Sequence, residues 1–100
     1  MRVILSTCAN IEEAKKIARA LVEEKRAACV NIVPKIFSVY EWQGELQEDE
    51  EVLLLIKALE FEPVRQRIKE LHSYEVPEIV ALEIKEVDGA YLRWMREVLV

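Results

Sequence analysis

The first third of the chain predicts a strand followed by a helix that lies on a sheet. Residues 2–7 form a short apolar run that ends in polar side chains. Asn10, with Glu13 three residues later, has the spacing of a helix cap and capping box. The next residues place apolar side chains on one face at helical spacing: Ala14, Ile17, Ala18, Leu21 and Val22.

The middle of the chain predicts a long β-hairpin. Residues 30–40 are rich in β-branched and aromatic side chains, whereas Gly44 and the acidic run 48–51 are typical of a turn and of solvent contact. The continuous apolar run 52–56 is typical of a central strand that is buried on both faces. Pro34 interrupts the first arm, which indicates a bulge or an edge strand.

The last third predicts a second helix, a fourth strand and a short terminal helix. Pro63 can begin the helix, whose apolar face carries Phe61, Val64, Ile68 and Leu71. Residues 73–77 form a turn and residues 78–87 a strand. Asp88 then caps a helix that carries Tyr91, Trp94, Met95 and Val98.

This order, βαββαβ plus a terminal helix, predicts an α+β fold: a single ferredoxin-like domain over residues 1–100. Both main helices would cover one face of an antiparallel sheet, which leaves only the terminal helix for the other face. Hydrophobic residues make up 52% of the chain, at the upper edge for a soluble monomer of 100 residues. We therefore expect an apolar sheet face that is buried in an oligomer.

Charge and hydropathy limit the classes of partner that the chain is expected to bind. The net charge of −5 repels phosphate backbones, so nucleic acid is not expected as a partner. No apolar run reaches the length of a membrane-spanning helix, and the N-terminus becomes polar too early for a signal peptide. We expect a cytoplasmic protein without a membrane partner.

The two cysteines predict free thiols. Cys8 and Cys29 form no CxxC motif and would lie at opposite ends of the sheet, too far apart for a disulfide. Cys29 stands in an Ala-Ala-Cys-Val run that is typical of a buried hydrophobe. Cys8 stands at a strand end, where an exposed thiol would contact a soft metal.

Motifs for the common activities of this fold are missing. A copper chaperone needs a CxxC in the first loop, and an RNA-recognition domain needs aromatic residues on the third strand. The chain has one histidine, no Gly-x-Ser-x-Gly motif and no glycine-rich phosphate loop. We therefore expect no enzyme.

Several segments taken together identify a family resemblance. The strand opening Ala27-Ala28-Cys29-Val30-Asn31-Ile32 is followed by Ser38-x-Tyr40-x-Trp42-x-Gly44 and by Glu51, Leu54 and Lys57. His72-x-Tyr74-x-x-Pro77-Glu78-Ile79 and Tyr91-Leu92-x-Trp94 complete the pattern. Over nearly its whole length the chain resembles the CutA family of divalent-cation tolerance proteins.

The resemblance implies a ferredoxin-like protomer in a homotrimer assembled through sheet edges and the long hairpin. It implies tolerance to copper and other divalent cations, and structural similarity to the trimeric PII signalling proteins. In some members copper has been assigned to a cysteine near the end of the first strand and to a double histidine. Those positions hold Ser6 and Leu71 here, so this chain retains only His72 of that set.

Candidate site residues follow, each with a structural alternative. His72 and Cys8 are the candidate metal ligands, although His72 can also be a helix-end histidine that favours the helix dipole. Tyr40 and Trp42 lie on one face of the hairpin arm and would form interface packing or line a pocket between subunits. The acidic residues 45 and 48–51 are interpreted as a solvated hairpin tip.

A second group of candidates would line a cleft. Tyr74 and Glu78 would converge near His72, with Lys57 of the central strand as a counter-charge, or else form a structural turn.

We predict a trimeric, non-catalytic divalent-cation (copper) tolerance protein with weak or conditional metal binding. One alternative is a PII-like signalling module that binds an anionic metabolite in the intersubunit cleft near Lys57, Tyr74 and Glu78. Another is a purely structural trimer that acts through protein partners.

Overall fold

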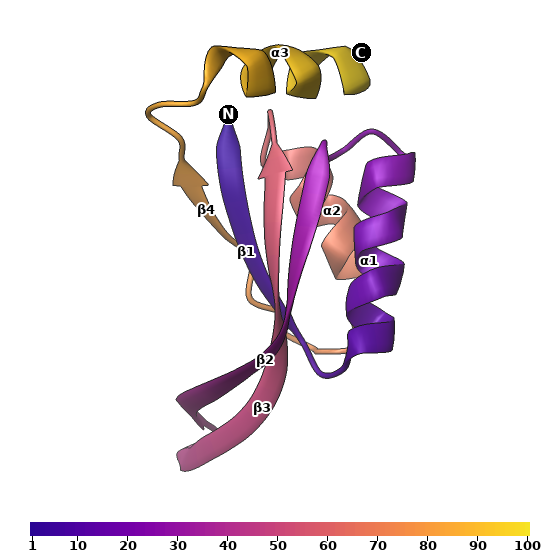
Figure 1. Ribbon diagram of the computed structural model, residues 1–100. Helices are drawn as coiled ribbons and strands as arrows, with labels where there is room; N and C mark the ends of the chain where they lie inside the picture. Colours follow the sequence, from indigo (N-terminus) through magenta and orange to yellow (C-terminus); the bar gives the residue numbers. More distant parts are fainter.

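The computed structural model describes residues 1–100 and contains one antiparallel sheet with two helices packed on one of its faces (Figure 1). The elements follow the order βαββαβα, and the strands pair in the order β2-β3-β1-β4, which confirms the predicted α+β arrangement. Their bounds are β1 Arg2–Cys8, α1 Ile11–Glu23, β2 Cys29–Trp42, β3 Glu45–Ala58, α2 Glu62–Leu71, β4 Val80–Glu83 and α3 Gly89–Val98.

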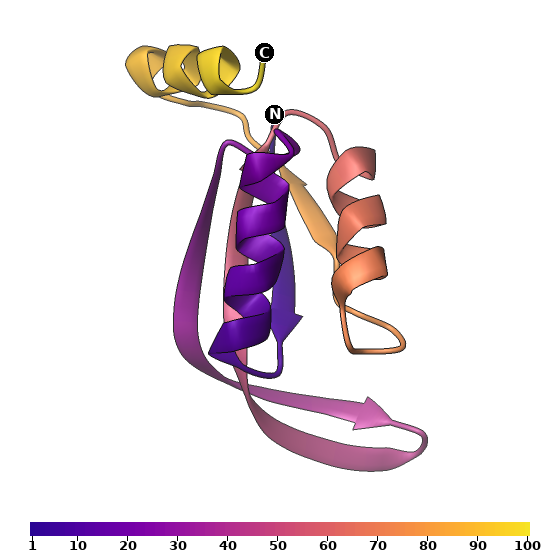
Figure 2. The same ribbon diagram turned by 90° about the vertical axis from the view of Figure 1, so that its right-hand side faces the viewer.

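The hairpin of β2 and β3 extends well beyond the sheet as a two-stranded arm (Figures 1 and 2). Strand β1 pairs with β3 only over residues 52–58, so the outer halves of β2 and β3 pair with each other alone. Gln43 and Gly44 connect them with positive φ at both positions, as a two-residue type I′ turn requires. The predicted irregularity at Pro34 is confirmed, because the register shifts between Val33 and Ile36 on this edge strand.

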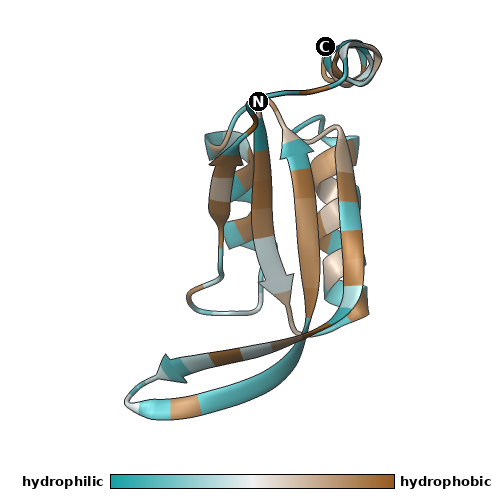
Figure 3. Cartoon of the chain, turned by 60° about the vertical axis from the view of Figure 1, so that its left-hand side comes forward, coloured by the Kyte–Doolittle hydropathy of each residue, from teal (hydrophilic) through white to brown (hydrophobic).

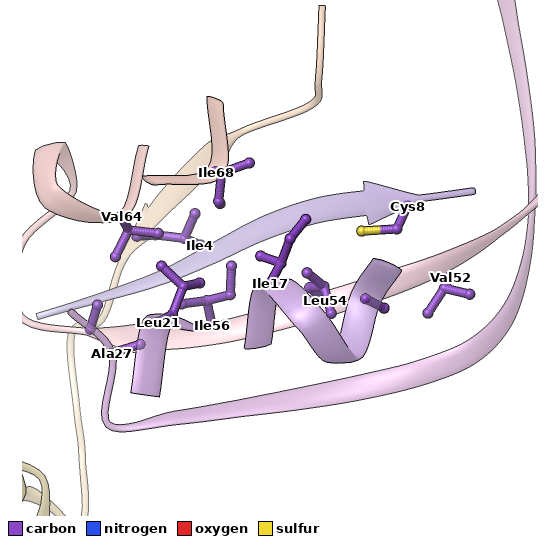
Figure 4. Packing of buried hydrophobic residues seen from close by; sticks show 12 residues of the cluster. Ile4, Cys8, Ile17, Leu21, Ala27, Val52, Leu54, Ile56, Val64 and Ile68 are labelled. Carbon is purple, nitrogen blue, oxygen red and sulfur yellow. The ribbon is translucent and has the colours of Figure 1, made fainter. Parts of the chain in front are cut away.

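The hydrophobic core lies between the sheet and the helices α1 and α2 (Figure 4). Alternate residues of the central strands, including Ile4, Leu54 and Ile56, are fully buried there. They pack in one cluster with the helix residues Ile17, Leu21, Val64 and Ile68. Truncation of one such side chain to alanine typically costs about 2–5 kcal/mol of the free energy of unfolding. Val22, predicted on the core face of α1, is instead 43% exposed.

Side-chain caps start two of the helices where the sequence predicts them. Asn10 Oδ1 accepts a hydrogen bond from the Glu13 N–H at 2.8 Å, and Asp88 caps α3 through the N–H groups of Ala90 and Tyr91. The second half of the predicted capping box does not form. The Glu13 carboxylate accepts a hydrogen bond from the Ser73 N–H instead, at 3.2 Å, and is thereby directed toward the segment after α2.

Two predictions about the end of the chain are wrong. Strand β4 covers Val80–Glu83 and not residues 78–87, because its only neighbour is β1, where pairing runs from Leu5 to Arg2. Helix α3 does not cover the open face of the sheet. It lies crosswise beyond the end of the sheet, near the N-terminus (Figures 1 and 2).

The face of the sheet opposite α1 and α2 is therefore uncovered (Figure 3), and the residues of β1, β3 and β4 that point away from the core are largely apolar. Its side chains alternate with those of the core, so Leu53 and Leu55 are only half-buried. The expectation that the run 52–56 is buried on both faces thus holds for one face. On the edge strand, Val80 and Leu82 are 48% and 55% exposed.

Candidate functional site

A cysteine, a carboxylate and a histidine meet where β1 ends. Cys8 is the last residue of β1, Glu13 lies in the first turn of α1, and His72 caps the C-terminus of α2. One ligand atom from each lies within 4.8 Å of the other two. We call these three residues the His72 cluster. It joins both metal candidates, Cys8 and His72, and adds Glu13, which was assigned only to the helix cap.

Hydrogen bonds hold the His72 ring in one orientation. Its side chain is fully buried, and its Nε2 lies 2.7 Å from the Thr7 carbonyl oxygen. Because a carbonyl can only accept, Nε2 carries the proton, and Nδ1 accepts from the Tyr74 N–H at 3.0 Å. The ring thus contacts β1 and not the carbonyls of its own helix. His72 ends α2 through its backbone, as the helix-end interpretation predicts, but its side chain does not cap that helix.

The Glu13 carboxylate has one satisfied oxygen and one that lacks a partner. Oε2 accepts from the Ser73 N–H, whereas Oε1 is buried without a hydrogen bond, 3.8 Å from His72 Nδ1. Leaving such an acceptor buried and unpaired costs on the order of 1–3 kcal/mol. The cluster therefore contains one unpaired carboxylate oxygen beside a nitrogen and a sulfur.

The two cysteines occupy the reverse of their predicted environments. Cys8 is fully buried in the core cluster, and Cys29 is half-buried on the open face of the sheet. The reason is strand alternation, since Cys8 shares the inward direction of Ile4 and Ser6. Burial, with the nearby Glu13 and Glu51 carboxylates, raises the pKa of the Cys8 thiol to about 12. Both thiols are free, as predicted.

A cleft opens between the hairpin arm and the segment that follows α2. Its volume is about 880 Å³, and it includes four of the predicted residues: Tyr40, Trp42, Tyr74 and Glu78. We call it the hairpin cleft. Its other lining residues are Thr7, Ala9, Ser38, Val39, Asp49, Glu50, Glu51, Glu75 and Val76.

Two tyrosine–carboxylate pairs lie in the hairpin cleft. The Tyr74 hydroxyl donates to Glu51 Oε2 at 2.8 Å, and the Tyr40 hydroxyl donates to Asp49 Oδ2 at 2.5 Å. Burial, followed by the bond to Glu51, raises the pKa of Tyr74; the bond to Asp49 is the main cause that raises the pKa of Tyr40. Glu51 is only 8% exposed, so the interpretation of the acidic run as solvated is wrong for this residue.

Lys57 does not lie in the hairpin cleft. It pairs with Val3 and Cys29 at the opposite end of the sheet from Cys8, and its Nζ donates to Asn31 Oδ1. Within one chain its charge therefore does not offset the carboxylates near Tyr74 and Glu78. Sequence reasoning missed Glu13 and Glu51 because a polar residue in a helix cap or an acidic run is ordinarily solvated.

The comparisons with known proteins agree with this architecture. The family model described as CutA1 divalent ion tolerance protein matches residues 2–98. The chain belongs to this family. The Divalent-cation tolerance protein CutA of Thermus thermophilus is 55% identical over 97 residues, which cover 95% of this chain and 94% of that protein. Human Protein CutA is 45% identical over 94 residues, 92% of this chain but 52% of the human protein.

Solved CutA structures share the fold over the whole chain. The Thermus thermophilus protein superposes with a TM-score of 0.92 at 54% identity and covers 97% of both chains. The Periplasmic divalent cation tolerance protein CutA of Archaeoglobus fulgidus reaches 0.94 at 35% identity, with 100% of both chains covered. None of these names includes a catalytic activity.

The names of the relatives point to more than one compartment. The Arabidopsis thaliana relative is named chloroplastic and the Archaeoglobus fulgidus protein periplasmic. In the present chain no helix is both long and apolar enough to cross a membrane.

Proposed function

We propose that this member of the CutA1 family binds a divalent cation of the copper–zinc type at the His72 cluster, without catalysing a reaction. The observation that carries the proposal is the convergence of a sulfur, a nitrogen and a carboxylate oxygen within 4.8 Å. Imidazole and thiolate ligands suit copper and zinc, and such sites generally favour Cu²⁺ over Zn²⁺.

The surroundings of the cluster support this assignment. A metal at this position would satisfy the orphaned Glu13 Oε1, which lies beside His72 Nδ1. The opposite ring nitrogen donates to the Thr7 carbonyl, an arrangement common to histidines that bind metals. The Ser73 N–H similarly fixes the other Glu13 oxygen. Both side chains are thus oriented by backbone groups before any metal arrives.

The same geometry makes binding weak and conditional. The Cys8 thiol, with its pKa raised to about 12, must lose its proton to become a ligand. Coordination through Nδ1 also displaces the hydrogen bond from the Tyr74 N–H. Each step subtracts from the binding free energy, so we expect an affinity below that of structural zinc sites.

The proposed assembly is the homotrimer. Its support is the uncovered apolar face of the sheet, together with exposed apolar side chains on the arm: Phe37 and Leu46 are each 72% exposed and Val39 64%. Contiguous apolar surface of this kind usually marks a protein contact. Light scattering at several micromolar concentrations should give three times the chain mass of 11.7 kDa. A monomer across that range would remove this part of the proposal.

Metal titration with two matched cysteine variants tests the site. Anaerobic Co²⁺ titration of the wild type should produce an absorption band from thiolate-to-metal charge transfer, and added Zn²⁺ should remove that band by displacing Co²⁺. Cys8→Ala should abolish the band and lower Zn²⁺ affinity about 100-fold, because a ligand is lost. Cys29→Ala removes a thiol outside the cluster and should change neither result.

The thermal midpoint of each metal-free variant shows whether it folds. Zn²⁺ should raise the midpoint of the wild type and of Cys29→Ala by mass action, but not that of Cys8→Ala. Equal Zn²⁺ affinity in a folded Cys8→Ala variant would refute the assignment.

A further inference from the structure

The hairpin cleft is a concave site whose charge has a single sign. Five carboxylates line it, from Asp49, Glu50, Glu51, Glu75 and Glu78, and none of its lining residues is lysine, arginine or histidine. Only Glu50 forms an ion pair, with Lys35 at 3.5 Å. Negative charge gathered in a concave surface raises the local concentration of cations.

The spacing of these carboxylates disfavours a bare metal ion. In the whole chain, the His72 cluster is the one place where three ligand atoms of histidine, cysteine or carboxylate side chains gather within 4.8 Å. Calcium requires six to eight oxygen ligands at roughly 2.3–2.6 Å, which the dispersed carboxylates of the cleft do not supply. A cation that satisfies them must itself be extended.

Aromatic side chains supply the remaining walls. Tyr40 and Trp42 lie two residues apart on the arm and line the cleft, and within one chain they are 42% and 43% exposed. An ammonium group over such a ring gains about 0.5–2 kcal/mol. The hydroxyl bonds of Tyr40 to Asp49 and of Tyr74 to Glu51 hold each ring next to a carboxylate. Each pair thus combines an aromatic ring with a negative charge, the two features that bind an alkylammonium group.

We propose that the hairpin cleft binds an extended organic cation, a linear aliphatic diamine or polyamine. The volume of about 880 Å³ is within the range of small-molecule sites and leaves room for a flexible chain with several charges. Glu51, which is nine-tenths buried, anchors one ammonium group at the base of the cleft. This site is separate from the metal site, and either proposal can fail alone.

Titration of the metal-free protein with spermidine tests the proposal. Calorimetry in the presence of a chelator should show saturable binding that weakens with added salt, as expected for charged partners. In a Trp94→Phe variant the fluorescence reports Trp42 alone, and it should change with the same midpoint. Mg²⁺ at equal ionic strength should not displace spermidine.

Matched variants separate the cleft from general charge attraction. Glu51→Gln should lower spermidine affinity about tenfold, and Trp42→Ala about threefold to tenfold. Glu45→Gln removes the same charge from the hairpin tip, outside the cleft, and should have no effect beyond about twofold. Thermal midpoints identify any variant that fails to fold, and Glu78→Gln provides a second carboxylate test at the rim.

Three results would each overturn the proposal. The first is absence of saturable binding, which would also result if another copy of the chain filled the cleft. The second is equal weakening by Glu51→Gln and Glu45→Gln. The third is full displacement of spermidine by Mg²⁺ at the same ionic strength.

Discussion

The His72 cluster and the hairpin cleft use neighbouring residues for opposite purposes. Thr7 and Cys8 are adjacent in β1 and point to opposite faces, Cys8 into the cluster and Thr7 into the cleft. Likewise His72 belongs to the cluster and Tyr74 to the cleft. The cluster is closed and its three donors are of different chemistry, whereas the cleft is open and its carboxylates are dispersed among aromatic rings.

The difference shows that the number of acidic groups does not determine the kind of cation. The cluster contains one carboxylate, yet that carboxylate has a buried, unpaired oxygen next to two other ligand atoms. The cleft contains five carboxylates, and no three of them gather at metal-binding distance. Burial and spacing favour a metal ion in the first case and an extended organic cation in the second.

The largest expected effect is the contrast in reactivity between the two thiols. With a pKa of about 12, only about one Cys8 thiol in 10,000 is ionised at pH 8, and it is also buried. Iodoacetamide at pH 8 should therefore modify Cys29 much faster than Cys8 in the folded protein, because the Cys8 thiol is both buried and protonated. Peptide mass spectrometry gives both rates. Similar rates for the two cysteines would show that the cluster is open.

The raised pKa of Cys8 also predicts how the stability of the protein changes with pH. The folded Cys8 retains its proton up to about pH 12, whereas an unfolded cysteine loses it near its ordinary value of 9.0. The unfolded state therefore binds fewer protons in this window, and the contribution of Cys8 to the free energy of unfolding falls as pH rises from 9 to 12. In denaturant melts, the free energy of unfolding of the wild type should therefore fall relative to that of Cys8→Ala as the pH rises over that range.

Glu13→Gln should change metal affinity and stability in opposite directions. Loss of the charged ligand should lower Zn²⁺ affinity about tenfold or more, while replacement of the carboxylate with its unpaired buried oxygen should raise the free energy of unfolding of the metal-free protein by about 1 kcal/mol. Competition titration and urea melts measure the two quantities. Glu12→Gln, at an exposed position in the same helix turn, is the control. A destabilised Glu13→Gln protein would mean that Oε1 has a stabilising partner.

Tyr74→Phe should affect the cleft and spare the cluster. It removes the hydroxyl bond to Glu51 but keeps the backbone N–H that donates to His72 Nδ1. Spermidine affinity should fall about threefold to tenfold, and Zn²⁺ affinity should stay within about twofold of the wild-type value. Tyr91→Phe, on α3, is a matched control. An equal loss of both affinities would mean that the two regions form one site.

The smallest expected effect is mutual weakening of the two ligands. Metal binding through Nδ1 releases the Tyr74 N–H, and the metal also adds positive charge near the cleft. Saturating Zn²⁺ should therefore weaken spermidine binding about twofold to fivefold, and spermidine should weaken Zn²⁺ binding by the same factor. Calorimetric titrations in both orders measure the two factors. Spermidine affinity that is unchanged by saturating Zn²⁺ would show that the two sites are not coupled.

Local patterns were sufficient for most of the fold. Apolar periodicity located α1 and α2, the Asn10 and Asp88 caps marked helix starts, and Pro34 marked the irregular edge strand. Each signal depends on a residue and its near neighbours along the chain. The predictions that were wrong, the length of β4 and the position of α3, depend on which strand lies beside β4 and on where the last helix packs. Neither is a local property.

The sequence by itself determined the order of elements, the free thiols and the resemblance to one family, because these follow from residue type and spacing. Only the tertiary structure decided that Cys8 is buried and Cys29 half-exposed, since this depends on the face of each strand that the helices cover. It also joined Glu13 to His72 across 59 positions of sequence and, within one chain, placed Lys57 away from Tyr74. Such pairings arise when the chain folds, because the distance between two side chains is set by packing and not by their separation along the backbone.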